Sequence, residues 1–256
     1  MMINLEYLML MGLVFARISG LFALLPVFGS RNIPAQLKAM LLFFISLVVM
    51  PVVSLTTNLA IESFLGLMYH IFIEFFIGLT FGMIMTIMLS AIYLAGGLVD
   101  RNVGFSMVNV INPLDQTSMP VSANLYYMFA MLVFLFTDGH HILLKTIIES
   151  LSTIPLGGGS LNVLIVMDFT TLLSEAFIMG VRLSAPFIIA ILVANIILGM
   201  LSKAMPGMNV FMIGMPFKVF VGLALFSLMM PMYYNSFIEI YKTIYNYLYD
   251  LLYNYI

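Results

Sequence analysis

The 256-residue sequence contains no cysteine and no tryptophan, and only 8% of its residues are charged. The absence of cysteine excludes disulfides, thiolate metal sites, iron–sulfur clusters and cysteine nucleophiles. An ordinary soluble domain is about one quarter charged, so the composition also excludes that class. The net charge of -2 indicates no polyanionic partner such as a nucleic acid.

Hydrophobic residues make up 63% of the chain, and the mean hydropathy is +1.16. Six apolar stretches cover residues 5–28, 39–55, 64–99, 121–137, 176–201 and 210–234. A bilayer span takes about 20 apolar helical residues. The sequence therefore predicts an all-α protein of polytopic, membrane-associated helical hairpins. The first stretch lacks a basic start and a small-residue cleavage site, so we expect it to remain in the folded protein.

The third stretch, residues 64–99, is too long for one ordinary span. As a helix it would measure roughly 54 Å, and it leaves no room for two spans and a loop. We expect it to tilt, to kink or to project beyond the hydrocarbon.

Polar residues inside the apolar stretches are rare and costly, so we expect them to face the bundle interior or a watery cavity. Besides His70 and Asn195, the candidates for buried polar groups are Arg17, Glu74, Glu175, Arg182 and Lys218. One interpretation is a proton or ion path. The other, which we favour, is that these groups are paired, snorkelling or buried in protein.

The sequence offers no convincing metal, cofactor or catalytic site. His140 and His141 are adjacent, and neighbouring residues on a helix point about 100° apart, which disfavours chelation of one ion. Asp138 is the single nearby third ligand, and Asp138-Gly139 is more typical of a turn or helix cap. Because phosphate-binding and hydrolase motifs are also absent, we expect no cofactor, no metal and no enzymatic activity.

Residues 100–120 form a long polar interruption between two apolar stretches, with apolar residues at its centre. Long irregular segments between membrane-type helices tend to be functional or to line a cavity. Met and Phe make a pliable surface that can close around an irregular object. A plug in a pore and a simple surface loop are equally compatible with this pattern.

Four motifs resemble the FliR family of flagellar biosynthetic proteins and, more broadly, subunit T of type III secretion export gates. They are RISGLFALLPVFGSRNIPAQLK at 17–38, GFSMVNVINP at 104–113, FTDGHHILLKTIIESLSTIPLG at 136–157 and PGMNVFMIGMPFKVFVGL at 206–223. Together they span nearly the whole chain in the expected order.

The resemblance implies a FliP-like region at residues 1–160 and a FliQ-like helical hairpin and tail at 161–256. It also implies a pore-plug loop at 105–120. Its leading residues are Phe105, Ser106, Met107, Val108, Asn109, Val110, Ile111, Asn112 and Pro113.

The function that the resemblance implies is that of a subunit of the flagellar type III export gate. With FliP and FliQ it would form a channel for unfolded flagellar proteins in the bacterial inner membrane, within the basal body and beside an FlhB-type subunit. An injectisome export gate is the first alternative. A small-molecule secondary transporter and a structural scaffold without a pore are less favoured.

Overall fold

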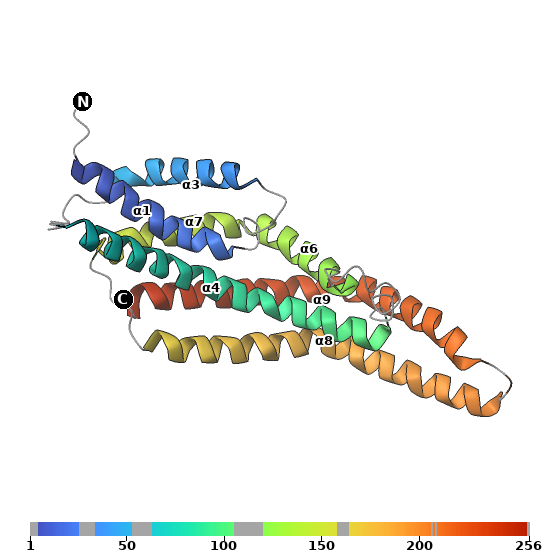
Figure 1. The fold of residues 1–256 in the computed structure, drawn as a ribbon. Helices are drawn as coiled ribbons and strands as arrows, with labels where there is room; N and C mark the ends of the chain where they lie inside the picture. The colour runs from blue at the N-terminus through green and yellow to red at the C-terminus, as the bar shows by residue number, and fades with distance from the viewer. Residues whose placement is uncertain are drawn as a thin grey trace. The chain divides into compact units, whose positions relative to one another are not determined.

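The computed structural model describes residues 5–25, 34–52, 63–104, 120–157, 164–205, 207 and 209–254, and these residues form helices and turns without any strand. The helices are α1 (Leu5–Leu24), α3 (Ala35–Val49), the 3-10 turn η1 (Met50–Val52), α4 (Phe64–Val103), α6 (Val121–Phe136), α7 (Gly139–Thr153), α8 (Leu164–Ala204) and α9 (Val210–Asn254) (Figure 1). The predicted all-α class is confirmed.

Four of these helices contain segments long and apolar enough to cross a membrane. The segments are Tyr7–Leu24, Phe64–Val103, Phe169–Ala204 and Met212–Tyr253, and α6 with α7 would make a fifth if the pair is one broken span. The predicted polytopic membrane protein is therefore confirmed in its helix lengths and apolar composition.

Three helices extend beyond the apolar stretches from which the sequence predicts them. The helix α4 reaches Val103 and so includes Asp100, which the sequence had placed at the start of a loop. The helix α8 begins twelve residues before the predicted stretch, and α9 continues through Pro231 to Asn254. Proline removes one backbone donor from a helix, but membrane-type helices tolerate it where neighbouring groups satisfy the freed carbonyl.

Two compact units divide the chain, and each is made of separated segments. The first comprises Met1–Ile87, Asp138–Leu172 and Lys242–Ile256, and the second comprises Met88–Thr137 and Leu173–Tyr241. The expected division at residue 160 concerns likeness to two different partner proteins, and it stays a prediction.

In the first unit, glycines bring α1 and α4 into backbone contact. A Cβ atom on Gly20 would overlap the carbonyl oxygen of Phe75, and one on Gly78 would overlap the carbonyl oxygen of Arg17. Small residues let apolar helices approach this closely. The Thr86 hydroxyl adds a hydrogen bond across the pair by donating to the carbonyl of Leu24 at 2.9 Å.

In the second unit, aromatic side chains form the centre of the core. The Tyr126 ring lies 5.0 Å from the Tyr233 ring and 6.3 Å from the Phe187 ring, both in edge-on geometry. Aromatic pairs at these separations add to the stability gained from burial alone. The hydroxyl of Tyr241 donates to the carbonyl of Ala130 at 2.6 Å, which ties α9 to α6.

Candidate functional site

A buried ion pair joins α1 to α4 in the first unit. Arg17 and Glu74 are both fully buried, and the Arg17 Nε donates to Glu74 Oε2 at 2.5 Å. Burying two charges is costly unless they are paired and their remaining hydrogen-bonding groups are satisfied. The contact is therefore the first element of a larger polar cluster.

The end of α7 adds further hydrogen bonds to this cluster, in which Arg17 Nη2 alone of the guanidinium nitrogens has no partner among the described residues. The Arg17 Nη1 donates to the carbonyl of Ser150 at 2.8 Å and to that of Ile154 at 3.2 Å, while the backbone N–H of Gly157 donates to Glu74 Oε1 at 2.8 Å. The carboxyl end of a helix carries partial negative charge, which favours a cation there. We call these five residues the Arg17–Glu74 clasp, and it links α1, α4 and the end of α7.

The hydrogen bonds of the clasp define what Glu74 does in this arrangement. Each of its two oxygens accepts one bond, from Arg17 and from Gly157. A carboxylate held in this way is a paired group that fixes the positions of the helices around it. That geometry fits the structural interpretation of the polar residues better than a relay of protons.

The remaining candidates for buried polar groups lie in the second unit and are less enclosed. Glu175 and Lys218 are half-buried, and Arg182 is exposed. Arg182 thus departs from the expected burial, because it lies on a face of α8 that the described residues leave uncovered. Its neighbours Ile178 and Val181 are exposed on the same helix.

A second polar contact joins the end of α4 to the start of α6. The Asp100 side chain is almost fully buried, and its two carboxylate oxygens lie 3.0 and 3.2 Å from the backbone nitrogen of Ser122, which donates to them. The Asp100 carboxylate takes the role of an N-cap side chain for α6, because Pro120 at the N-cap position makes no side-chain hydrogen bond. Gly96 lies against the backbone of Ala123 nearby.

This contact lies at the base of the predicted plug segment. The residues assigned to the plug, Phe105–Pro113 and onward to 119, fall outside the residues that the structure describes. The described helices α4 and α6 flank that segment, and the Asp100–Ser122 contact holds their adjoining ends together. The sequence places Asp100 in a loop and does not reveal its role, because the burial of its carboxylate depends on α6.

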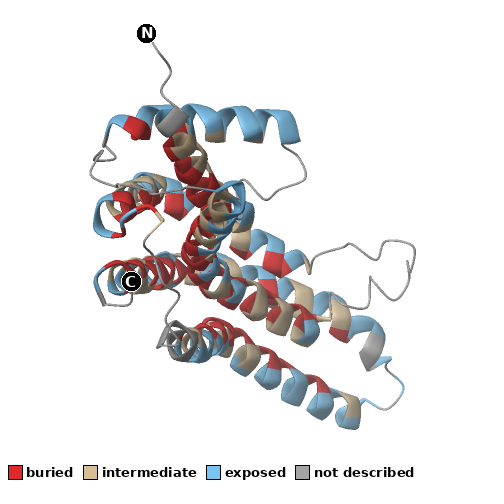
Figure 2. Ribbon diagram, turned by 60° about the vertical axis from the view of Figure 1, so that its left-hand side comes forward, coloured by how far each residue is buried: buried red, intermediate tan, exposed pale blue. Residues whose placement is uncertain are grey.

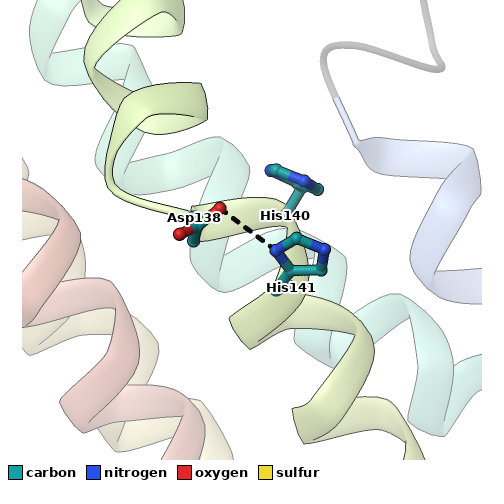
Figure 3. A group of neighbouring side chains, drawn as sticks. All are labelled: Asp138, His140 and His141. Atoms are coloured by element: carbon teal, nitrogen blue, oxygen red, sulfur yellow. Dashed lines mark hydrogen bonds and ion pairs between the residues drawn. The ribbon is translucent and has the colours of Figure 1, made fainter.

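The side chains of Asp138, His140 and His141 converge at the start of α7 (Figure 3). Asp138 occupies the N-cap position of α7 in a left-handed conformation with φ of 55°, but its side chain makes no cap hydrogen bond, so the expected cap is present in position only. Its Oδ1 lies 3.1 Å from Nδ1 of His141. The two imidazole rings lie 4.1 Å apart between centroids, so the expectation that adjacent histidines diverge is wrong here.

Large apolar side chains remain exposed along several helices. On α3, Phe44 and Val48 are 59% and 76% exposed, and exposed residues line most of that helix (Figure 2). The outer face of α8 is similar, from Leu173 to Leu201, as is that of α9 from Met212 to Tyr234. A soluble monomer rarely leaves apolar surfaces of this extent uncovered.

Comparison with known proteins identifies one family. A model of the bacterial export proteins, family 1, matches residues 8–244. The flagellar biosynthetic protein FliR of Bacillus subtilis (strain 168) is 30% identical over 82% of this chain and 81% of its own. FliR of Escherichia coli (strain K12) is 29% identical over 92% and 90%, and FliR of Aquifex aeolicus (strain VF5) is 26% identical over 89% and 87%.

Proposed function

Because the chain belongs to the bacterial export proteins, family 1, we propose that it forms, with FliP and FliQ, a channel for unfolded flagellar proteins in the inner membrane. It is a membrane component of the flagellar export apparatus. Beyond that role, we propose that the chain assembles with FliP and FliQ, lies in the inner membrane within the basal body and lines part of the channel.

The length of the apolar helices is the observation that carries this proposal. The helices α4, α8 and α9 have 40, 41 and 45 residues, which is roughly 60 to 68 Å. A hydrocarbon core is about 30 Å thick, and a tilt of about 40° lengthens the path through it only to about 39 Å. Parts of these helices therefore project from the hydrocarbon, where their exposed apolar faces need protein partners.

FliP and FliQ are the partners that this proposal assigns to those faces. Residues 1–160 would take the place of a FliP-like subunit and residues 161–256 that of a FliQ-like hairpin, with an FlhB-type subunit on the cytosolic side. Interfaces of this kind are rich in apolar contacts, as in obligate assemblies. Lipid would cover the remaining apolar surface.

The proposed mechanism is steric and requires no enzymatic step. Residues 105–120 would close the channel at rest and move when an exported chain engages the gate. The Asp100–Ser122 contact supports this assignment, because it fixes the two helix ends from which such a plug would extend. Movement would then be confined to the segment between those ends.

Secretion by a strain that lacks the gene tests the function as a whole. We expect loss of motility and loss of flagellin and hook protein from the culture medium, with both restored by a complementing copy. Co-purification of the tagged chain with FliP and FliQ tests the partners. Retained flagellar secretion in the deletion strain would refute the proposed role.

Ion leakage tests the plug. Deleting residues 106–119 should raise conductance through the assembled complex in lipid vesicles, because the segment that blocks the channel is gone. The matched control replaces the same residues with an equal length of Gly and Ser, which keeps the connection but removes the apolar side chains. Unchanged leakage in both variants, with an intact complex, would exclude the plug and favour a scaffold without a pore.

A further inference from the structure

We propose that Asp138, His140 and His141 form a binding site for a divalent transition-metal ion such as Zn²⁺. Each of the three side chains offers one ligand atom, and these atoms all lie within 4.8 Å of one another. Figure 3 shows the rings of His140 and His141 side by side at the first turn of α7, with the Asp138 carboxylate facing His141. The site lies entirely within the first unit.

The backbone before α7 accounts for this convergence. The carbonyl of Asp138 accepts the N–H of His141 at 2.9 Å, which closes the first turn. With Asp138 in the left-handed conformation, its carboxylate comes to 3.1 Å from the His141 ring. The angle of about 100° between adjacent helical residues fixes only where their Cβ atoms point, and the ring rotamers bring the imidazoles together.

The ring of His140 is the second observation, and it matters because Asp138 and His141 lie beside it; His70 has a similar unpaired Nδ1 but belongs to no such group among the described residues. The Nδ1 atom of His140 is buried and has no hydrogen-bond partner among the described parts of the chain. A buried polar nitrogen left unpaired costs free energy, and no bond at this atom fixes the tautomer of the ring. The ring can therefore present a lone pair to a metal without first breaking a hydrogen bond.

The donor set determines which kind of ion fits. Two imidazole nitrogens and one carboxylate oxygen suit Zn²⁺, Ni²⁺ or Co²⁺, whereas Mg²⁺ and Ca²⁺ favour oxygen ligands throughout. Three protein ligands leave at least one position for water. The side chains of Asp138 and His141 are 71% and 68% exposed, so they are free to move the short distance that coordination requires.

The chain contains three histidines, which gives the experiment its own control. We would purify the full chain without a histidine tag, in detergent and in complex with its partners, and titrate Zn²⁺ against a chromophoric chelator. Wild-type protein should bind one ion per chain, and His70→Ala should bind it equally well. His140→Ala, His141→Ala and Asp138→Asn should each weaken binding by about tenfold or more, since even the loss of an outer-shell partner costs about 10- to 100-fold.

A second measurement covers the case in which a variant does not fold. Zn²⁺ added to wild-type protein should protect His140 and His141, but not His70, from chemical modification of the imidazoles, as read by mass spectrometry. Co²⁺ in its place should give the visible absorption of a site with mixed nitrogen and oxygen ligands. Equal protection of all three histidines, no protection, or unaltered binding by folded His140→Ala and His141→Ala variants would overturn the proposal.

Discussion

Removing the charge of Glu74 should strongly destabilise the first unit. Glu74→Gln keeps an oxygen that can accept the N–H of Gly157, but it removes the charge and places an amide NH₂ group opposite the Nε–H donor of Arg17. Arg17 then remains fully buried and charged, because a guanidinium is not deprotonated in proteins. Breaking a buried pair in this way costs about 3–5 kcal/mol. That corresponds to a fall of about two to three and a half orders of magnitude in the ratio of folded to unfolded protein.

A double-mutant cycle measures how much of this loss belongs to the pair. Arg17→Gln and Glu74→Gln should each be destabilising, while the double variant should lose less than the sum, because it leaves no buried charge unpaired. We expect a coupling free energy of about 2 kcal/mol or more, within the range found for residues in direct contact. The free energy of unfolding would be measured by steric trapping in detergent micelles.

A less buried pair provides the control for this cycle. Lys145 and Glu149 lie 3.6 Å apart on α7, and the Lys145 side chain is 68% exposed. Lys145→Gln should change the free energy of unfolding by less than about 1 kcal/mol. If Glu74→Gln were equally mild and the cycle simply additive, the clasp would not stabilise the unit and our account of it would be refuted.

Three further predictions concern packing and capping, and all are measured as changes in the free energy of unfolding. Gly78→Ala should lower the free energy of unfolding by about 1–3 kcal/mol, because the new Cβ would overlap a carbonyl of α1. Gly12→Ala, with open space around it, should be neutral or stabilising. Equal effects of the two substitutions would contradict the close crossing of α1 and α4. Asp100→Ala should cost about 1–2 kcal/mol because α6 loses its capping acceptor, and no loss would show that the contact is incidental. Tyr241→Phe removes a buried bond to a carbonyl and should cost about 0.5–1.5 kcal/mol; a more stable variant would argue against that bond.

The sequence predicts the helices of this protein well because long apolar runs have few other solutions in a membrane. It places their ends poorly. The helix α4 runs on through Asp100 to Val103, and α9 through Pro231 to Asn254. Asp100 and Pro231 each signal a helix break when taken locally. In α4 the contact with Ser122 accommodates Asp100, and in α9 the helix continues through the proline.

For the candidate sites too, the sequence reveals which residue types are unusual but not which residues contact one another. Arg17 and Glu74 stand out singly as charges in apolar runs, but they are 57 residues apart, and nothing in their spacing pairs them. The contribution of Gly157 is a backbone N–H, which no residue type reveals. At the start of α7, helical geometry alone argued against His140 and His141 acting together, because side-chain rotamers are not visible in a sequence.

The clasp also bears on how the chain is made. Arg17 leaves the ribosome first, Glu74 follows 57 residues later, and the carbonyls of Ser150 and Ile154 follow 133 and 137 residues after Arg17. At about 5–20 residues per second, Glu74 emerges roughly 3–11 s after Arg17, and the end of α7 roughly 7–27 s after it. During synthesis α1 and α4 can therefore pair first. The helix α7 docks afterwards and supplies the two carbonyls that accept hydrogen bonds from Arg17 Nη1.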